Sequence, residues 1–580
     1  MDASLIPIED LQFLLRWLDP VQSEDDRETV TAILNLAGQL ASDAFLTHYK
    51  DSDRTEPELR SDGVHVLPVI GEALRAYADA GFFAAGFAAE LGGLGLSSVF
   101  SSAIFAQFAA ANVATAAYPM LTGANARLIA NFGSPAQIDH FVLPMIAGKW
   151  FGTMCLSEPQ AGSSLADIRT RAVADGRDGL GECYRLAGNK MWISGGDQDV
   201  SANIVHLVLA KIPHPDGALP EGTQGISLFI VPKILPEGTR NDIAVAGLNH
   251  KMGYRGTANC LLNFGEVEGA TGWLVGEPGR GLAQMFQMMN EARISVGIGA
   301  AALAIRGYRL SLGYARERLQ GRHPGERSGP PVPIIEHADV KRMLLAQKAY
   351  AEGALALCLF CASLVDRDND VDASALLALL TPVAKTWSSE YGLEANDMAI
   401  QIHGGYGYTR DFDVEQLYRD NRLNPIHEGT TAIQAADLLG RKLLRDTGAL
   451  ALLLAKVSEC AARASDDHSF ASHGRALSTA WETVEEAVAI MGTAPTDRVL
   501  DNAVPLLSAF GHGVMGWLWL DLALAARDAA VRGEVPDAFA RGKGRACRYF
   551  FEYELPKISA WLTPVAAMSD VCSGAATDEF

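Results

Sequence analysis

Basic residues are in the minority in this chain of 580 residues, which has 48 Lys and Arg against 69 Asp and Glu and a formal net charge of −21. Such an acidic chain repels nucleic acid phosphates and anionic membrane surfaces, so its composition argues against both as partners. It does not exclude a local cationic patch for the phosphates of a small ligand. With 49% hydrophobic and 20% charged residues, the chain has the composition of a soluble globular protein of about three or four domains.

Cysteine is also scarce, with eight residues spread along the chain. Only Cys358 and Cys361 form a Cys-x-x-Cys pair, and no second pair follows that could complete a metal site. Their Ala- and Leu-rich surroundings are typical of a helix and favour buried thiols over a metal or redox site. The first residues lack the basic and apolar regions of a secretory signal, so we expect a reducing, cytoplasmic location.

Charge is absent altogether between Glu90 and Arg127, a stretch long enough to raise the question of a membrane span. Gly, Ser, Thr, Gln, Asn and Pro are scattered through it, which favours helices buried in a bundle. A second apolar run, from Gly513 to Leu520, is interrupted by Asp521 far short of a span. Both stretches are therefore predicted to be core helices, and membrane contact is not expected.

The period of the apolar residues changes along the chain and predicts four domains. Helical spacing gives way to strand-like spacing, helical spacing then returns, and Ala-rich helical segments follow. The predicted domains are an N-terminal helical domain, a β domain, a second helical domain and an extra C-terminal helical domain, at residues 1–150, 151–278, 279–445 and 446–580.

The predicted β domain contains short β-rich runs at 204–209, 225–231 and 260–264, bounded by Gly, Pro and Asp. No amphipathic helix fits between these runs, which excludes a doubly wound sheet and favours a mostly antiparallel sandwich or barrel. The fold class is therefore α+β multidomain. It combines an N-terminal helical bundle, the central β-sandwich or barrel, a C-terminal bundle of the four-helix type and the extra C-terminal helices.

A Gly-x-Gly-x-x-Ala run, Gly297 to Ala302, matches a dinucleotide-binding fingerprint, with Glu317 about twenty residues further on. That motif must follow a β-strand, whereas helical runs flank this one on both sides. We therefore interpret its small residues as a close contact between helices. The sequence also has no P-loop and no nucleophile elbow, and His427-Glu428 lacks the later His of a zinc-binding helix.

A carboxylate stands between turn-forming residues in the stretch NPIHEGTTAIQ, which runs from Asn424 to Gln434. Pro425 disfavours helix at the residue before it, and Gly429 lets the backbone approach whatever Glu428 faces. A Glu held on such a loop in front of a helix suits a general base aimed at a ligand. The alternative is a solvated charge at the N-terminus of that helix, and this stretch alone does not decide between them.

Three motifs in order favour the first interpretation. The run QIHGGYGY at 401–408, followed by Asp420-Asn421 and the Glu428 stretch, closely resembles the C-terminal signature of the acyl-CoA dehydrogenases. The run MCLSEPQAGSS at 154–164 resembles their flavin-binding signature, and KMWIS at 190–194 resembles the strand that backs the flavin ring. The extra C-terminal segment resembles that of the large bacterial members, which include long-chain and methylthiopropanoyl-CoA dehydrogenases.

The resemblance implies FAD-dependent oxidation of an acyl-CoA thioester to the trans-2-enoyl-CoA. Glu428 would take the α-proton while flavin N5 takes the β-hydrogen as hydride, and electron-transferring flavoprotein would receive the electrons. An exposed Glu has a pKa of about 4.3, far below that of a carbon acid. Desolvation of the base, hydrogen bonds to the developing enolate oxygen and hydride removal must together close that gap.

The resemblance also makes the β domain the flavin-binding domain. The implied contacts are Met154, Leu156 and Ser157 along the pyrimidine side of the ring and Trp192, Ile193 and Ser194 behind it. Trp192 offers an aromatic face and the Ser194 hydroxyl can donate towards N5. Taken separately, Trp192 on a strand could be a core residue and Ser157 a turn residue, whereas the motifs together favour the cofactor.

Arg318 and Gln320 correspond to residues that bind the FAD pyrophosphate of a neighbouring subunit, and a guanidinium fork suits that group. The run from Gln401 to Gly405 corresponds to one that meets the adenosine half. Sharing of FAD in this way implies a homodimer or a higher homo-oligomer. The alternative for Arg318 is a solvated helix charge.

The remaining implied contacts are Thr430 with the flavin, Ser163 with CoA, and Arg293 near CoA and the Glu428 loop. The sequence departs from the family at His427, where many relatives have Tyr. This His could tune Glu428, shape the substrate entrance or simply pack.

Two other functions remain open. An acyl-CoA oxidase would share the base and the flavin but return electrons to O2. A family member recruited to bind nucleic acid would need a basic face, and residues 541–580 carry five basic and five acidic residues.

Overall fold

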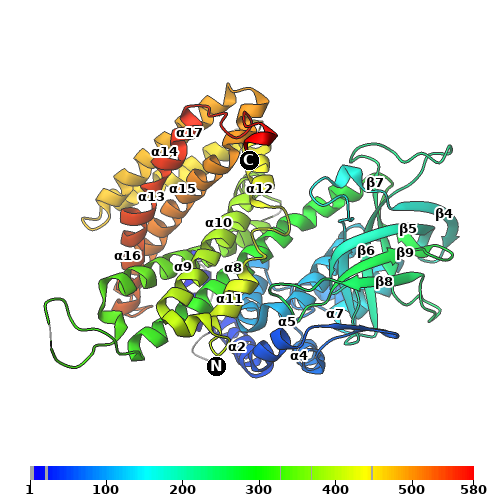
Figure 1. The fold of residues 1–580 in the computed structure, drawn as a ribbon, viewed down its shortest axis with the longest axis horizontal. Coiled ribbons are helices and arrows are strands. Elements are labelled where there is room, and N and C mark those ends of the chain that lie inside the picture. The colour runs from blue at the N-terminus through cyan, green and yellow to red at the C-terminus, as the bar shows by residue number, and fades with distance from the viewer. Residues whose placement is uncertain (1–4, 20–23, 327, 368, 446–447) are drawn as a thin grey trace. The chain divides into compact units, whose positions relative to one another are not determined.

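The structure is a computed structural model that describes residues 5–19, 24–326, 328–367, 369–445 and 448–580 (Figure 1). The chain divides into two compact units. The strand unit comprises Leu36–Ser97 and Gln107–Ala292, and the helical unit comprises Asp2–Asn35, Ser98–Ala106 and Arg293–Phe580. The unit boundary falls within helices α2 (Glu24–Leu40), α5 (Ser98–Phe132) and α8 (Gly281–Glu317). The predicted division into four domains stays a prediction.

The strand unit is built around an eight-stranded sheet within the described residues 150–274. Its strands are β3 (Trp150–Cys155), β4 (Arg171–Asp178), β5 (Gly181–Ser194), β6 (Asn203–Lys211), β7 (Ile226–Pro232), β8 (Ile243–Leu248), β9 (Asn259–Phe264) and β10 (Ala270–Leu274). Seven strands follow the order β10-β7-β6-β4-β5-β9-β8, and β3 pairs with β6 beside this path. Strand β10 also pairs with β5, which closes a barrel. Only β3–β6 and β4–β6 are parallel among the described pairs, which confirms the predicted mostly antiparallel sandwich or barrel.

Strands β6 and β7 are buried along their whole length, which explains their continuous apolar sequences. Their side chains pack with those of α5 and β10 in one core cluster that includes Leu207, Ile230 and Trp273. The predicted β-rich runs fall on β6, β7 and β9.

Short helices complete the strand unit. They are the π-helix Ala41–Phe45, the 3-10 helices Leu46–His48, Ala89–Leu91 and Leu165–Asp167, α3 (Tyr49–Arg54), α4 (Pro68–Asp79), α6 (Pro135–Gln137), the π-helix Ile138–Val142 and α7 (Leu143–Ile146).

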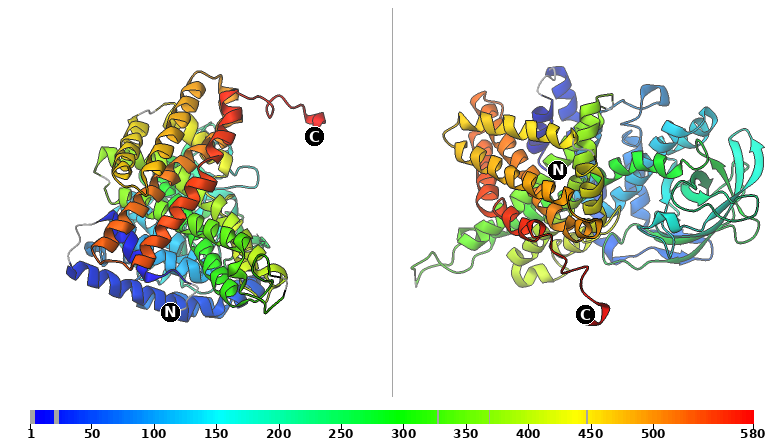
Figure 2. Two further views of the ribbon diagram at one scale, coloured as in Figure 1. Left: turned by 90° about the vertical axis from the view of Figure 1, so that its left-hand side faces the viewer. Right: turned by 90° about the horizontal axis from the view of Figure 1, so that it is seen from above.

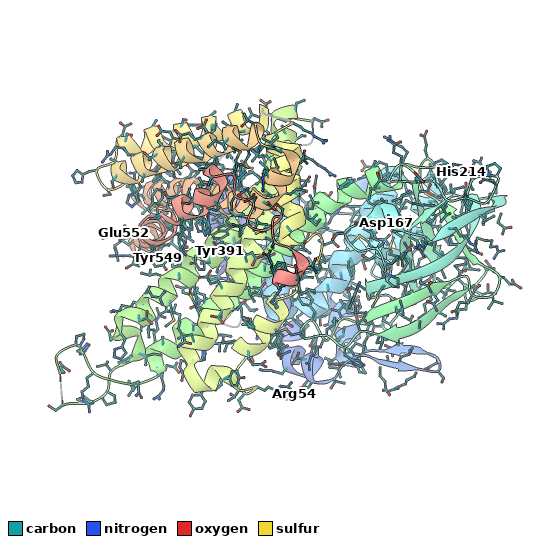
Figure 3. The ribbon with its side chains drawn as sticks, turned by 45° about the horizontal axis from the view of Figure 1, so that its top comes forward. Arg54, Asp167, His214, Tyr391, Tyr549 and Glu552 are labelled. Atoms are coloured by element: carbon teal, nitrogen blue, oxygen red, sulfur yellow. The ribbon has the colours of Figure 1, made fainter. Side chains whose placement is uncertain are left out.

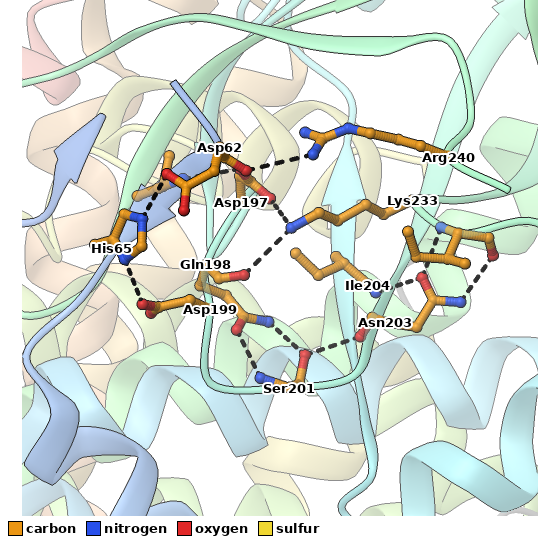
Figure 4. A network of polar contacts seen from close by, with 12 residues as sticks. Asp62, His65, Asp197, Gln198, Asp199, Ser201, Asn203, Ile204, Lys233 and Arg240 are labelled. Atoms are coloured by element: carbon orange, nitrogen blue, oxygen red, sulfur yellow. Dashed lines mark hydrogen bonds and ion pairs between the residues drawn. The ribbon is translucent and has the colours of Figure 1, made fainter. Parts of the chain in front are cut away.

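A β-hairpin interrupts the helices expected throughout residues 1–150, so that expectation is wrong at this point. β1 (Glu58–Arg60) and β2 (Gly63–His65) pair antiparallel. The Val64 N–H donates to Asp197 Oδ2 at 3.1 Å. His65 Nδ1 lies 2.8 Å from Asp199 Oδ2, within a polar network that ties the hairpin to the loop after β5 (Figure 4). These strands are three residues long and depend on partners more than a hundred residues away, so local periodicity carries no sign of them.

The helical unit confirms the helices expected after residue 280. Besides the later part of α8 it contains α1 (Ile8–Leu18), the 3-10 helices Ile334–Glu336, Gly404–Tyr408 and Thr577–Glu579, α9 (Ala338–Val365), α10 (Val371–His403), α11 (Val414–Asn421), α12 (Thr431–Asp437) and the π-helix Leu438–Leu443. The described residues of the Gly-, Pro- and Arg-rich connector at 321–333 are irregular and mostly exposed.

The Gly297 to Ala302 run lies inside α8. A Cβ atom added at Gly297 would stand 2.7 Å from both Ala384 O of α10 and Cys358 Sγ of α9. Three helices therefore approach one another at this glycine, which confirms the interpretation as a helix–helix contact. Cys358 and Cys361 are buried free thiols, also as predicted.

The extra C-terminal helices are α13 (Gly448–Ser465), α14 (Ala471–Gly492), α15 (Thr496–Val531), α16 (Asp537–Tyr549) and α17 (Lys557–Ala566). Helices α14, α15 and α17 pack side by side (Figure 2). Helix α16 passes into the π-helix Phe550–Glu554, which ends before α17 begins. Pro556 explains the break, because it has no N–H to continue the helical hydrogen bonds.

Three helices in the described chain are long and apolar enough to cross a membrane, judged by length and composition alone. They are Ser98–Phe132, Ala338–Val365 and Arg498–Val531. In the most apolar 18-residue stretch of each helix, 78%, 72% and 83% of the residues, respectively, are buried. The stretches from Glu90 to Arg127 and from Gly513 to Leu520 lie largely on the first and third of these buried helices, as predicted for core helices.

Candidate functional site

The first group of predicted site residues lies in the strand unit, where a buried lysine joins two of the sequence motifs. Lys190 Nζ of β5 donates to Leu156 O at 3.0 Å and to Glu158 Oε1 at 2.9 Å. Beside it, the Met191 N–H donates to Ser157 O at 3.0 Å. The segment after β3 is therefore held against the end of β5, and the structure brings the two flavin motifs together.

The Glu158 carboxylate also accepts hydrogen bonds from two adjacent residues further along the chain. Its carboxylate accepts from the Arg169 N–H at 2.7 Å, from the Thr170 N–H at 3.0 Å and from Thr170 Oγ1 at 2.6 Å. Burial alone would raise the pKa of Glu158, but the Lys190 charge and these hydrogen bonds lower it to about 2. The sequence motifs contain Glu158 and Lys190, but their buried ion pair was not predicted, because its two members are 32 positions apart.

Trp192 lies at an irregular point of the sheet. The register of β5 against β9 shifts between Lys190 and Ile193, and Trp192 has φ +67°. Its side chain is 58% exposed, which excludes the alternative of a core tryptophan. The neighbouring Ile193 side chain is buried, so its side chain belongs to the core of this unit.

Ser194 ends β5 and is oriented by an asparagine pair that the sequence analysis missed. Asn259 Nδ2 donates to Ser194 Oγ at 3.2 Å, and Asn249 Nδ2 donates to Asn259 Oδ1 at 2.8 Å. Four other residues of this unit are implied to bind ligand. Of these, Ser163 is exposed, and the remaining three are partly exposed: Met154, Leu156 and Ser157.

The second group lies in the helical unit and centres on Glu428. This residue has φ +52° and the following Gly429 has φ +90°, so two successive residues adopt left-handed conformations. Gln434 Nε2 of α12 donates to Glu428 O at 2.9 Å, and Lys385 Nζ of α10 donates to Gly429 O at 2.7 Å. Thr430 occupies the N-cap position of α12 without a side-chain capping bond.

Two nearby cations influence the pKa of the Glu428 carboxylate. Burial raises its pKa, while the charges of Arg293 on α8 and Lys385 on α10 oppose that rise. Arg293 is itself buried and its Nη1 lies 3.1 Å from Asp437 Oδ2 at the end of α12. A partly buried carboxylate with a raised pKa is a stronger base than a solvated helix charge.

His427 ends a chain of buried amides. Its Nε2 lies 3.1 Å from Asn424 Oδ1, Asn424 Nδ2 donates to Asn421 Oδ1 at 2.8 Å, and Asn421 Nδ2 donates to Asn396 Oδ1 at 2.7 Å. Burial and the nearby charge of Lys385 lower the pKa of His427 to about 3, so this imidazole is neutral at physiological pH. Sequence reasoning missed these amides and Lys385, because neither has a motif of its own.

A third group surrounds a ring stack in the helical unit. Tyr314 of α8 and His403 of α10 stack with their ring centroids 4.4 Å apart. The segments next to these two rings carry four of the implied ligand residues, and all four are exposed: Arg318, Gln320, Gln401 and Gly405. Arg318 Nη1 donates to Leu319 O at 2.6 Å, and its Nη2 lies 3.3 Å from Gln320 Oε1. The residues implied for pyrophosphate and adenosine therefore share one neighbourhood.

Four family patterns match the chain in order. They are the acyl-CoA dehydrogenase N-terminal domain at 50–149, its middle domain at 153–267, its C-terminal domain at 279–444 and the acetyl-CoA dehydrogenase C-terminal-like domain at 453–575. The match at 453–575 accounts for the extra C-terminal helices.

Two characterised relatives match the chain over nearly its whole length. The 3-methylmercaptopropionyl-CoA dehydrogenase of Ruegeria pomeroyi is 35% identical over 557 residues, which cover 91% of this chain and 92% of the relative. The broad-specificity linear acyl-CoA dehydrogenase FadE5 of Mycobacterium tuberculosis is 34% identical over 574 residues, which cover 93% and 92%.

Solved structures agree on the fold. Caenorhabditis elegans ACDH-11 in complex with C11-CoA superposes with a TM-score of 0.80 at 19% identity and covers 98% of this chain and 95% of that one. A Bacillus anthracis acyl-CoA dehydrogenase complexed with FAD has a TM-score of 0.77 at 21% identity and covers 96% and 91%. Together with the family patterns and the two relatives, these findings confirm the predicted membership: this chain is an enzyme of the acyl-CoA dehydrogenase family, in the group that carries an extra C-terminal domain.

Proposed function

We propose that this protein oxidises an acyl-CoA thioester to the trans-2-enoyl-CoA with bound FAD and passes the electrons to electron-transferring flavoprotein. The observation that carries the proposal is Glu428. A carboxylate is held in a left-handed turn, partly buried, with its pKa raised by burial and with two cations acting on it. Such a group suits the removal of a proton from carbon.

Glu428 takes the proton from the α-carbon in this proposal. Burial strengthens it as a base, while Arg293 and Lys385 keep its ionised form accessible. Two hydrogen bonds hold the turn in place: Gln434 donates to the Glu428 carbonyl, and Lys385 donates to the Gly429 carbonyl. A base that is fixed before the substrate binds needs no reorganisation during the reaction.

The residues of the strand unit fit a flavin. The exposed indole of Trp192 and the Ser194 hydroxyl both belong to the last residues of β5, and this end of the strand is tied to the Leu156-Ser157 backbone. An aromatic face beside polar groups suits a planar heteroaromatic ring. FAD, when bound, accepts the β-hydrogen as hydride. The residues proposed to hold it are Met154, Leu156, Ser157, Trp192, Ile193, Ser194, Arg318, Gln320, Gln401, Gly405 and Thr430.

The substrate class is proposed from the relatives. They act on 3-methylmercaptopropionyl-CoA and on linear acyl-CoA, and the structure of ACDH-11 contains C11-CoA. Ser163 and Arg293 are proposed to lie near the CoA. We also propose that the protein is a homo-oligomer and resides in the cytoplasm, where reducing conditions suit its free cysteines.

The base is tested with Glu428→Gln in the FAD-loaded protein. The amide cannot accept the proton, so we expect FAD content to be unchanged and the rate of flavin bleaching by acyl-CoA to fall by about 10²–10⁴-fold. The substrates are acyl-CoA esters of graded length, with branched and thioether-containing ones included. Glu336→Gln, which removes an exposed carboxylate paired with Lys341, serves as the control. Bleaching at the normal rate by Glu428→Gln would refute the proposal.

The electron acceptor is tested separately. Reduction of electron-transferring flavoprotein without release of peroxide supports the dehydrogenase, whereas peroxide formation at the rate of substrate oxidation would identify an oxidase. A gel shift with duplex DNA that disappears at high salt would support the nucleic-acid-binding alternative instead.

A further inference from the structure

Lys385 has no role in the sequence motifs, yet it is a fully buried lysine beside the proposed base. A buried ammonium is costly unless it is hydrogen-bonded or paired. Here Nζ donates to Gly429 O at 2.7 Å, one residue after Glu428. The polar atom that this side chain contacts is therefore part of the catalytic loop itself.

Helix α10 holds the loop at a second point. Thr431 Oγ1, on the first residue of α12, donates to Glu390 Oε1 of α10. Lys385 and Glu390 thus contact the loop on either side of Thr430, while Gln434 bonds to the backbone of Glu428. A non-glycine residue in the left-handed region is strained and persists only where its surroundings hold it there.

The charges around Lys385 come from three elements. They are Glu390 on its own helix, Glu428 and the neutral His427 on the loop, and Arg293 on α8. Burial lowers the pKa of Lys385 to about 8, against the effects of Glu390 and Glu428. The ammonium form therefore prevails at neutral pH. Arg293, the other cation, is already paired with Asp437.

We propose that Lys385 is a positioning residue for the base. Its ammonium group fixes the Glu428-Gly429 turn through the Gly429 carbonyl and stabilises the ionised Glu428 carboxylate, so that the base is ready at neutral pH. This inference rests on the proposed role of Glu428.

The test uses Lys385→Met in the FAD-loaded protein. Methionine keeps most of the side-chain length but removes the charge and the donor. We expect kcat at neutral pH to fall by about 10²-fold, because the base is misplaced, with a smaller change in KM. The acid limb of the kcat profile should move to higher pH, because the Glu428 carboxylate loses a neighbouring cation. Lys385→Arg, which keeps the charge, should leave that limb near its wild-type position.

A second measurement does not depend on turnover. Amide hydrogen exchange in residues 426–434 should be faster in Lys385→Met than in the wild type, since Gly429 O loses its donor. The matched control is Lys543→Met, which removes a buried ammonium bonded at 2.8 Å to Asp10 and to Glu352. That variant should lower stability but change neither the acid limb nor the exchange of residues 426–434.

The outcomes separate the two proposals. If Glu428→Gln turns over normally, the proposed function fails whatever Lys385 does. If Glu428→Gln is inactive while Lys385→Met leaves both the acid limb and the loop exchange unchanged, the inference about Lys385 is overturned and the proposed function stands. If Lys385→Met does not fold, Lys385→Gln is measured in the same way, and an unmoved acid limb overturns the inference.

Discussion

Two of the proposed site residues share an unusual backbone conformation. Among the described residues, the non-glycine residues with positive φ are Trp192, Tyr254, Glu428 and Met568. Each such residue stores about 1–3 kcal/mol of strain. The proposed base and the proposed flavin-facing indole are thus both held by their surroundings in conformations that their side chains disfavour. Nothing in the sequence predicted this, because φ at these positions is imposed by packing.

Trp192→Gly should separate strain from binding. Glycine adopts φ +67° without strain, so we expect the melting temperature of the flavin-free protein to stay the same or rise. Loss of the exposed indole should lower the FAD content of the purified protein. Differential scanning fluorimetry and the flavin absorbance per chain measure the two effects, and Trp192→Phe, which keeps an aromatic face, is the control. A variant that retains its full FAD content would contradict the proposed role of the indole.

The Glu158–Lys190 ion pair joins strand β5 to the segment after β3. Both side chains are almost fully buried, at 3% and 0% exposure. Removing one member of a buried pair leaves the other charge uncompensated, which typically costs about 3–5 kcal/mol. The two partners lie on separate segments of the chain, so the pair also holds the segment after β3 in register with β5.

Lys190→Met should therefore lower the midpoint of urea unfolding by the equivalent of about 3–5 kcal/mol for the strand unit. The double variant Glu158→Gln/Lys190→Met removes both charges and should recover part of that loss. Tryptophan fluorescence, which reports on Trp273 in the core of this unit, follows the transition. Equal midpoints for the single and double variants would show that the charge on Glu158 carries no penalty.

Most elements were predictable because their apolar period is local. The β-rich runs at 204–209 and 260–264 match observed strands, and the helices expected within residues 279–445 are also found. The β1–β2 hairpin was not predictable, since its stability comes from Asp197 and other partners distant in sequence. For the same reason Glu428 could be singled out by its turn residues and its motif, whereas Lys385, one lysine in a helix of small residues, gave no local signal.

At the scale of the whole molecule, buried histidines link folding to pH. Burial lowers the pKa of His206 in the strand unit to about 4, and burial together with Lys385 lowers that of His427 in the helical unit to about 3. An unfolded histidine titrates near pH 6.5. Below that pH the unfolded chain binds protons that the folded chain does not, so stability falls as the pH falls.

We expect the contribution of His206 to lower the free energy of unfolding by about 3 kcal/mol as the pH falls from about 6.5 to about 4. His206→Gln should flatten this dependence, because the amide does not titrate and can still bond to Thr153 Oγ1, which lies 2.7 Å from His206 Nδ1. Melting temperatures of the two proteins between pH 7 and pH 4 provide the measurement. Parallel curves for variant and wild type would contradict the prediction.

The C-terminal helices are part of the same packed unit as the proposed base. Helix α12 packs against α15, and Trp387 Nε1 of α10 lies 3.2 Å from His512 Nδ1 of α15. The rings of Tyr391 and His512 are in contact, with centroids 4.9 Å apart, and Tyr391 lies among the helices of this unit (Figure 3). The helix that carries Lys385 is therefore supported on its other side by the extra domain.

The long apolar helices have a consequence during biosynthesis. While the chain is still emerging from the ribosome, Ser98–Phe132, Ala338–Val365 and Arg498–Val531 each resemble a segment that membrane-insertion machinery accepts. Only packing against the rest of the protein conceals them, and the third belongs to the last quarter of the chain. Correct sorting of newly made chains therefore depends on how fast tertiary packing follows translation, so the yield of native enzyme should be sensitive to chaperone supply.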